Sequence, residues 1–298
     1  MKIAISGASG FIGARLLETL AGAGHQLHVF SRRAGAPPPP AVSLSVWDPI
    51  AGEPASGDLR DQDAVIHLAG ENVGQRWTAE ARRLILESRV NGTRHLVAAL
   101  ARLPRRPATL ICASATGYYG PRGDEIVDES AAPGTGFLAE VCAAWEREAQ
   151  AAESLGVRVV RMRIGVVLDP RGGALQRMLP PFRMGVGGRL GDGRQWMSWI
   201  HLDDLAALFR FALEQPLEGP LNGVAPQPVT NAEFARALAQ AIRRPALFPM
   251  PGLVLRALFG EMAEMLLTGQ RVAPRAASAA GFTFRFPRLD AALADLLR

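Results

Sequence analysis

Hydrophobic positions in the first 170 residues follow two alternating periods. Short apolar runs rich in β-branched residues predict buried strands, and stretches with apolar residues three or four apart predict amphipathic helices. The predicted strands are Ile3 to Ser6, Gln26 to Phe30, Ala64 to Leu68, Thr109 to Ala113 and Arg158 to Ile164. The predicted helices are Ile12 to Ala23, Thr78 to Leu103 and Phe137 to Leu155. This alternation predicts an α/β fold, a Rossmann-like doubly wound parallel sheet.

Beyond Asp169 the regular alternation of predicted strands and helices ends. Glycines gather between Gly185 and Gly193, and we expect residues 170–198 to be a loop region that lines a cleft. Thr230 and Glu233 have the spacing of a capping box, which predicts a helix running to about Ile242. We therefore predict a Rossmann domain over residues 1–225 and a small, mainly helical C-terminal lobe over residues 226–298. A loop containing Pro37 to Pro40 is expected after the second strand.

Composition excludes several classes of protein. The chain of 298 residues is 48% hydrophobic and 20% charged, which indicates a folded domain rather than a disordered chain. The net charge is +5, but the basic residues are scattered, so we predict no nucleic-acid binding. No apolar run approaches the roughly 18 residues of a membrane span, and Gly7 comes too early for a signal peptide. Two cysteines form no disulfide framework, which favours a cytoplasmic protein.

A glycine-rich turn is the first candidate site. Gly7, Gly10 and Gly13 stand three residues apart between a predicted strand and a predicted helix. Gly7 permits a tight turn, Gly10 lets the backbone approach a pyrophosphate, and Gly13 lets the helix pack against the strand. The N–H groups at the start of the helix attract an anion. We predict that a dinucleotide binds here, with further contacts from Ser9, Phe11 and Ile12.

The end of the second strand bears on which dinucleotide binds. Ser31 and Arg32 follow Gly13 by 18 and 19 residues, near the position where NAD enzymes carry an acidic group for the ribose hydroxyls. A hydroxyl followed by a guanidinium suits the 2′-phosphate of NADP instead, because arginine matches phosphate oxygens as a fork. We therefore predict NADP, bound by Ser31 and Arg32. The alternative is that Arg32 and Arg33 only solvate a loop.

Several segments together indicate a family. The glycine turn, Asp63 to Gly70 and Val90 to Thr93 resemble the extended short-chain dehydrogenase/reductases, the epimerase/dehydratase superfamily. Gly117 to Tyr119, Phe137 to Cys142 and Trp199 to Leu205 are similar to an atypical branch of that superfamily, which ends in a C-terminal domain of unknown function. The resemblance covers essentially the whole chain.

The resemblance implies further cofactor contacts. Leu68, Ala69 and Gly70 would lie beneath the cofactor at a strand end. Arg89 falls where many members of the superfamily place a cofactor-contacting asparagine, and its guanidinium would face a phosphate; the alternative is an arginine on the helix surface. Val166 would lie near the nicotinamide.

The usual acid/base pair of the superfamily is missing. That pair is a tyrosine and a lysine four residues apart on one helical face, where the ammonium favours phenolate. The matching helix from Phe137 to Glu146 has neither, and Lys2 is the one lysine among 33 basic residues. By resemblance Ser114 occupies the place of the hydroxyl donor. We take Ser114 and Tyr118 as the catalytic candidates; the alternative is that Ser114 satisfies backbone groups and the tyrosines form a pocket wall.

Other reactive residues favour structural roles. Asp203 or Asp204, after His201, is more simply a helix N-cap than a metal ligand, and we predict no metal site. Cys142 falls within an apolar helix, where an inert buried thiol is expected.

These residues leave two functions open. The first is an NADP(H)-dependent oxidoreductase or epimerase-like enzyme that acts on an unidentified small polar molecule. The second is a non-catalytic NADPH-binding sensor or scaffold. The sequence predicts no membrane partner and leaves a homo-oligomer open.

Overall fold

A computed structural model describes residues 1–33 and 42–298; the proline-containing loop predicted at Pro37 to Pro40 lies outside these ranges. Its centre is a seven-stranded parallel sheet in the order β11-β7-β5-β4-β1-β2-β3. The strands are β1 (Lys2–Ser6), β2 (Gln26–Ser31), β3 (Val42–Val46), β4 (Ala64–His67), β5 (Thr109–Ala115), β7 (Arg158–Ile164) and β11 (Gly219–Gly223). The chain starts near the middle of the sheet and builds outward in both directions. This confirms the predicted Rossmann-like, doubly wound fold.

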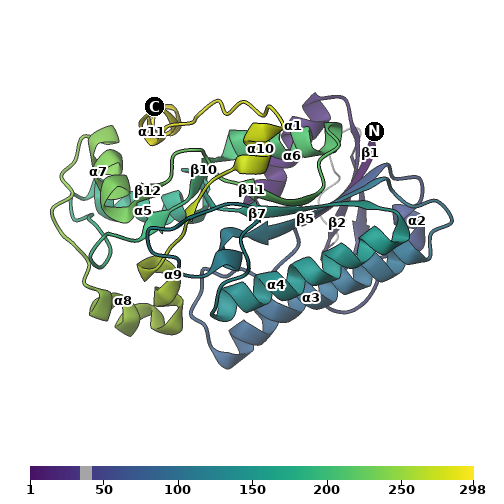
Figure 1. Cartoon of the computed structure of the whole chain (residues 1–298), viewed down its shortest axis with the longest axis horizontal. Helices are drawn as coiled ribbons and strands as arrows, with labels where there is room; N and C mark the ends of the chain where they lie inside the picture. Colours follow the sequence, from purple (N-terminus) through teal and green to yellow (C-terminus); the bar gives the residue numbers. More distant parts are fainter. Residues whose placement is uncertain (34–41) are drawn as a thin grey trace.

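Helices cover both faces of the sheet (Figure 1). On one face α1 (Phe11–Gly22) packs against α6 (Leu202–Glu214), and on the other α3 (Ala79–Ala101) packs against α4 (Phe137–Gln150). Each face has its own buried apolar cluster, one with Leu16 and Phe209 and the other with Leu96 and Trp145. The predicted helices are therefore confirmed, because their apolar spacing matches the face that each buries.

Two edge strands and one helix differ from the sequence prediction. The strands β3 and β11 were missed because edge positions tolerate polar and breaking residues, here Ser43 and Ser45 in β3 and Pro220 in β11. The prediction of a loop over residues 170–198 was wrong for α5 (Gly173–Arg183). Two prolines inside this helix and the glycines around it mask the helical spacing of its buried residues, Leu175, Leu179 and Phe182.

The C-terminal part is mainly helical. It contains α7 (Asn231–Ala241), α8 (Gly252–Phe259), η3 (Gly260–Met262), α9 (Ala263–Leu267), α10 (Arg275–Ala279) and α11 (Leu289–Leu296). The capping box is confirmed, since Thr230 and Glu233 each accept a hydrogen bond from the other's backbone N–H. No helix in the described ranges is both long and apolar enough to cross a bilayer.

Two short two-stranded sheets connect this part to the rest of the chain. They pair β12 (Val229–Thr230) with β9 (Trp196–Met197), and β13 (Arg271–Val272) with β6 (Ile126–Val127). A further sheet pairs β10 (Trp199–His201) with β8 (Val166–Asp169), both before the predicted boundary. One apolar cluster joins Phe182 and Trp199 to Phe234 and Leu293. The lobe therefore draws its core from both sides of the boundary predicted at residue 225.

The start of α6 corrects the capping prediction. Neither Asp203 nor Asp204 is the N-cap, because the His201 ring accepts the Asp203 N–H through Nδ1 at 3.0 Å. The Asp204 carboxylate instead accepts the backbone N–H groups of Arg285 and Phe286, both at 2.9 Å. It thereby ties the C-terminal segment to the central domain. Burial raises the pKa of Asp204.

Candidate functional site

Strand register brings the predicted cofactor segments together. Ser6, the last residue of β1, pairs with Phe30 in β2 and with His67 in β4. The glycine turn, Ser31 and Leu68 therefore leave the sheet side by side at its carboxyl edge. Ligands of open α/β sheets bind at this edge, where the strand order reverses.

The turn has the geometry that its glycines predict. Gly7 has a φ of +73°, and a side-chain carbon there would lie 2.8 Å from the carbonyl carbon of Leu68. A carbon on Gly13 would lie 2.3 Å from the carbonyl oxygen of Gly7. Gly10 is the N-cap of α1 and has no side chain to accept the first helical amides. Ser9 and Gly10 are exposed. These residues fit the diphosphate of a dinucleotide, which the uncapped amides would bind.

Phe11 links the turn to the segment that precedes α5. A side-chain carbon on Gly172 would lie 2.4 Å from the Phe11 ring. Gly172 thus leaves the space that this ring fills, a role that was not predicted although the pair Gly172-Gly173 was visible in the sequence. Phe11 and Ile12 are half-buried. Val166, the first residue of β8, donates its N–H to the Ser198 carbonyl at 2.8 Å and begins the pairing with β10.

A buried histidine fixes the loop after β4. His67 is fully buried, and its Nδ1 lies 2.6 Å from the Ser6 hydroxyl oxygen. That oxygen also accepts the Ala69 N–H at 3.4 Å. Burial lowers the pKa of His67 to about 4, so the ring is neutral near pH 7. Leu68, Ala69 and Gly70 are therefore held beside the glycine turn by a contact that carries no charge.

Arg89 faces this loop rather than open solvent. A side-chain carbon on Gly70 would lie 3.1 Å from the Arg89 Cζ. The guanidinium also lies over the Trp145 ring at 5.1 Å and donates to the Ile85 carbonyl at 3.1 Å. Burial lowers its pKa, and within the described ranges no carboxylate forms an ion pair with it. A half-buried guanidinium without a carboxylate partner suits a phosphate group nearby.

A buried polar network lies next to this loop, under α4. Arg163 of β7 donates two parallel hydrogen bonds to Glu146 of α4, at 2.8 and 2.9 Å. The Ser114 hydroxyl donates to the same carboxylate at 2.7 Å. Arg163 also donates to the Tyr119 hydroxyl at 2.9 Å, and Tyr119 donates to Asn222 at 2.7 Å. All five residues are buried, so the network fixes the carboxyl ends of β5 and β7.

Glu146 and Arg163 were not predicted from the sequence as parts of the site. The available signal was a charged residue in a strand predicted to be buried, and an acidic residue in an apolar helix. Charged side chains in such places are normally paired. Because the Ser114 hydroxyl donates its hydrogen bond to Glu146, the Ser114 oxygen can still accept a hydrogen bond from another group.

The two tyrosines have different surroundings. Burial raises the pKa of Tyr119 to about 12, so its phenol stays protonated within the network. Tyr118 is half-buried, and its ring lies 3.6 Å from the Arg163 Cζ. Among the described contacts its hydroxyl has no hydrogen-bond partner. Of the two tyrosines, Tyr118 is therefore the one whose hydroxyl is not engaged in the buried network.

The two cysteines are buried and unreactive, as expected from the sequence for Cys142. Cys112 and Cys142 are free and buried, and burial raises the pKa of Cys142 to about 11, which makes the thiol unreactive. In the described part of the chain no group of three or more His, Cys, Asp or Glu side chains is placed to hold a metal ion.

The fold and the turn define a dinucleotide-binding protein of the Rossmann type. Residues 3–225 match the model of the NAD dependent epimerase/dehydratase family, and residues 250–296 match DUF1731, a domain of unknown function. The chain belongs to the NAD dependent epimerase/dehydratase family.

Relatives and solved structures agree with this assignment. The epimerase family protein Mb2239 of Mycobacterium bovis is 46% identical, over 98% of this chain and 96% of its own. The mouse epimerase family protein SDR39U1 is 40% identical over all of both chains. The crystal structure of human SDR39U1 with NADPH is 38% identical, has a TM-score of 0.89, and is matched over 100% of this chain and 99% of its own. A UDP-glucuronic acid 4-epimerase from Bacillus cereus, 18% identical with a TM-score of 0.82, shares the fold.

Proposed function

We propose that this protein binds NADPH in preference to NADH. The observation that carries the proposal is the grouping of the glycine turn, Ser31 and Arg32 at one sheet edge, with Ser31 and Arg32 near the sequence position where NAD enzymes carry an acidic residue. Arg89 supplies a second cation at this edge. The human relative, solved with NADPH, supports the same cofactor.

Replacing Arg32 by alanine is expected to weaken NADPH binding about tenfold or more, the effect of losing one charge-assisted hydrogen bond. NADH binding is expected to change little, because NADH lacks the 2′-phosphate. Calorimetric titration of both cofactors measures the difference. Arg60→Ala, which removes another exposed arginine, is the control. Equal losses for the two cofactors would show that Arg32 does not contact the 2′-phosphate.

The proposed activity is reduction or oxidation of a small polar substrate at the same edge. The cofactor, when bound, exchanges a hydride at its nicotinamide C4. The Tyr118 hydroxyl would give a proton to the substrate oxygen, or take it in the reverse direction. The Ser114 oxygen, whose own proton is held by Glu146, would accept a hydrogen bond from a substrate hydroxyl. The Arg163 guanidinium against the Tyr118 ring holds that phenol in place.

The activity is tested by NADPH oxidation over a panel of aldehydes, ketones and nucleotide sugars. With any substrate that reacts, Tyr118→Phe is expected to lower kcat about 100-fold or more, the usual contribution of a general acid. NADPH affinity should be unchanged, which separates chemistry from binding. If no compound gives turnover above background while NADPH binds, the enzyme proposal fails.

The second candidate is a non-catalytic NADPH sensor or scaffold. It is favoured by α4, which has Phe137 or Leu138, and then Val141 or Cys142, where the superfamily's tyrosine and lysine would be sought. Binding without turnover in the panel would support it. The cytoplasmic location expected from the cysteines stays a prediction.

A further inference from the structure

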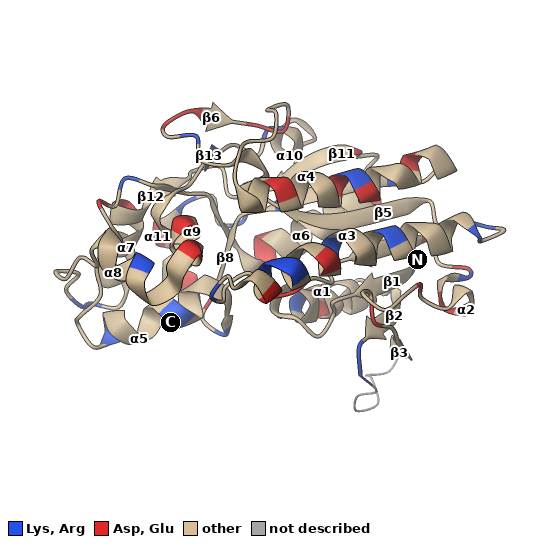
Figure 2. Cartoon of the chain, turned by 90° about the horizontal axis from the view of Figure 1, so that it is seen from below, with Lys and Arg blue, Asp and Glu red and all other residues tan. Residues whose placement is uncertain are grey.

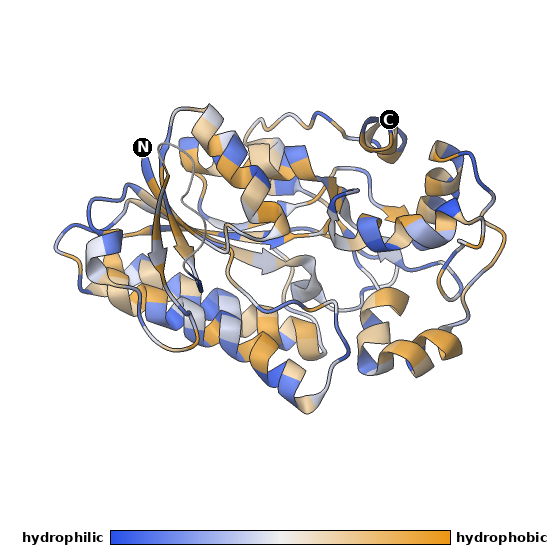
Figure 3. Cartoon of the chain, turned by 180° about the vertical axis from the view of Figure 1, so that it is seen from behind, coloured by the Kyte–Doolittle hydropathy of each residue, from blue (hydrophilic) through white to orange (hydrophobic). Residues whose placement is uncertain are grey.

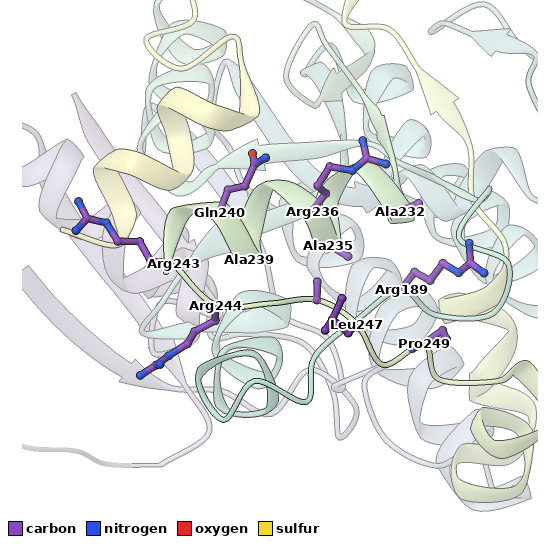
Figure 4. Close-up of a pocket in the computed structure, with 11 residues that line it drawn as sticks. Arg189, Ala232, Ala235, Arg236, Ala239, Gln240, Arg243, Arg244, Leu247 and Pro249 are labelled. Carbon is purple, nitrogen blue, oxygen red and sulfur yellow. The ribbon is translucent and has the colours of Figure 1, made fainter.

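A groove outside the cofactor site lies along α7. Its volume is about 630 Å³. It lies between α7 and the segment after the helix that includes Leu247 and Pro249 (Figure 4). None of the residues placed at the cofactor edge lines it. It is lined by Arg189, Ala232, Ala235, Arg236, Ala239, Gln240, Arg243, Arg244, Ala246, Leu247 and Pro249.

The groove is basic, and Glu233, three residues before Arg236, is an acidic neighbour that interacts with Arg236 without forming an ion pair. It is lined by Arg189, Arg236, Arg243 and Arg244 and by no acidic residue. All four arginines are exposed, and in the described ranges none of them forms an ion pair. Figure 2 shows further basic residues on α5 and α8 at this end of the molecule. A positive potential of this kind favours an acidic ligand.

The groove is also apolar. Its floor includes Ala235 and Ala239, and Leu247 at its side is 73% exposed. Phe248 and Val186, near the groove along the chain, are also exposed, and the Phe248 backbone N–H donates to the Gly187 carbonyl. Helix α8, which follows, is coloured as strongly hydrophobic in Figure 3. Apolar side chains gathered on a surface in this way mark an interaction site.

The placement of the arginines distinguishes between kinds of ligand. In Figure 4 the guanidinium groups point away from one another, with Arg243 and Arg244 at one end and Arg189 at the other. A single phosphate requires donors that converge on it. Arg236 lies within α7, whereas Arg243 comes after the helix ends at Ala241 and has a φ of 54°. Acidic side chains distributed along a bound helix would match arginines that are spread over the length of the groove in this way.

We propose that this groove binds an acidic, amphipathic helical segment of a partner protein. The apolar face of the segment would lie on Leu247, Ala235 and Ala239, and its acidic side chains would pair with the arginines at the rim. This is the helix-in-groove mode of recognition, with affinity from the apolar face and orientation from the charges.

The test uses a fluorescein-labelled 18-residue helical peptide, with leucines three and four residues apart and glutamates beside them. Fluorescence anisotropy with the full chain is expected to show saturable binding that weakens as salt rises. Arg236→Glu/Arg243→Glu is expected to weaken binding at least tenfold. Arg60→Glu/Arg147→Glu, which makes the same charge change at two other exposed arginines, should change it less than twofold. Leu247→Ser should also weaken binding, and thermal unfolding confirms that each variant is folded.

Three results would overturn the proposal. They are failure of the acidic peptide to bind, equal binding by a peptide with lysine in place of every glutamate, and equal losses in the two charge-reversed variants. Vesicles of anionic phospholipid and inorganic tripolyphosphate are tested alongside. Binding of either without binding of the peptide would assign the groove to a lipid surface or to a small polyanion, and would contradict a protein partner.

Discussion

Replacing Arg163 by methionine is expected to lower the free energy of unfolding by about 3–5 kcal/mol, the cost of leaving a buried charge without its partner. The Glu146 carboxylate would keep the Ser114 hydroxyl as a hydrogen-bond donor and Arg161, whose Nη1 lies 3.9 Å away, as a more distant cation, and Tyr119 would lose the bond from Arg163. Both members of the ion pair are almost inaccessible to solvent, so water cannot replace the lost contacts. Urea denaturation of the two proteins measures the difference.

Arg210→Met is the matched control. Arg210 pairs with Glu214 on the exposed side of α6, where both side chains are largely in solvent. Its loss should cost less than about 1 kcal/mol, as for other surface pairs. The double variant Arg163→Met/Glu146→Leu should recover much of the loss, because it removes the unpaired charge. If Arg163→Met costs as little as Arg210→Met, the network does not stabilise this edge as described.

Replacing Gly13 by alanine is expected to weaken NADPH binding about 100-fold or more and to cost about 1–3 kcal/mol of stability, as overpacking usually does. The added carbon would lie 2.3 Å from the Gly7 carbonyl oxygen, so the phosphate-binding turn must move. Titration calorimetry and urea denaturation of the same sample measure both effects.

Gly22→Ala provides the control within the same helix. A carbon on Gly22 meets no atom of the described residues within 4 Å, and Gly22 lies at the other end of α1. Alanine there should leave NADPH binding unchanged and stability equal or higher by about 0.5–1 kcal/mol. Wild-type NADPH affinity in Gly13→Ala would show that the turn does not form the phosphate site.

The central sheet could be predicted because its inner strands are buried on both faces and are therefore continuous apolar runs. The edge strands β3 and β11 could not, since an edge does not require that pattern. Helix α5 was hidden by Pro180 and Pro181, although its buried residues keep a helical spacing. Local periodicity therefore predicted the interior of the fold better than its margins.

The residues of the candidate site also differ in how far the sequence could predict them. The glycine turn was predictable because its residues are adjacent in the chain and each glycine has a local steric reason. The Arg163–Glu146 pair was not, because its members lie 17 residues apart on a strand and a helix, and Ser114 lies 32 residues from Glu146. Only the packing of α4 onto the sheet brings their side chains together. The groove along α7 likewise depends on a tertiary arrangement.

Calorimetric titration of NADPH and of NADH into the unmodified protein is the decisive experiment for the cofactor site. We expect a single site that binds NADPH at least about tenfold more tightly than NADH, the advantage of a charge-assisted contact with the 2′-phosphate. Absence of heat with both cofactors, in a sample whose unfolding transition shows that it is folded, would contradict a dinucleotide site at the glycine turn.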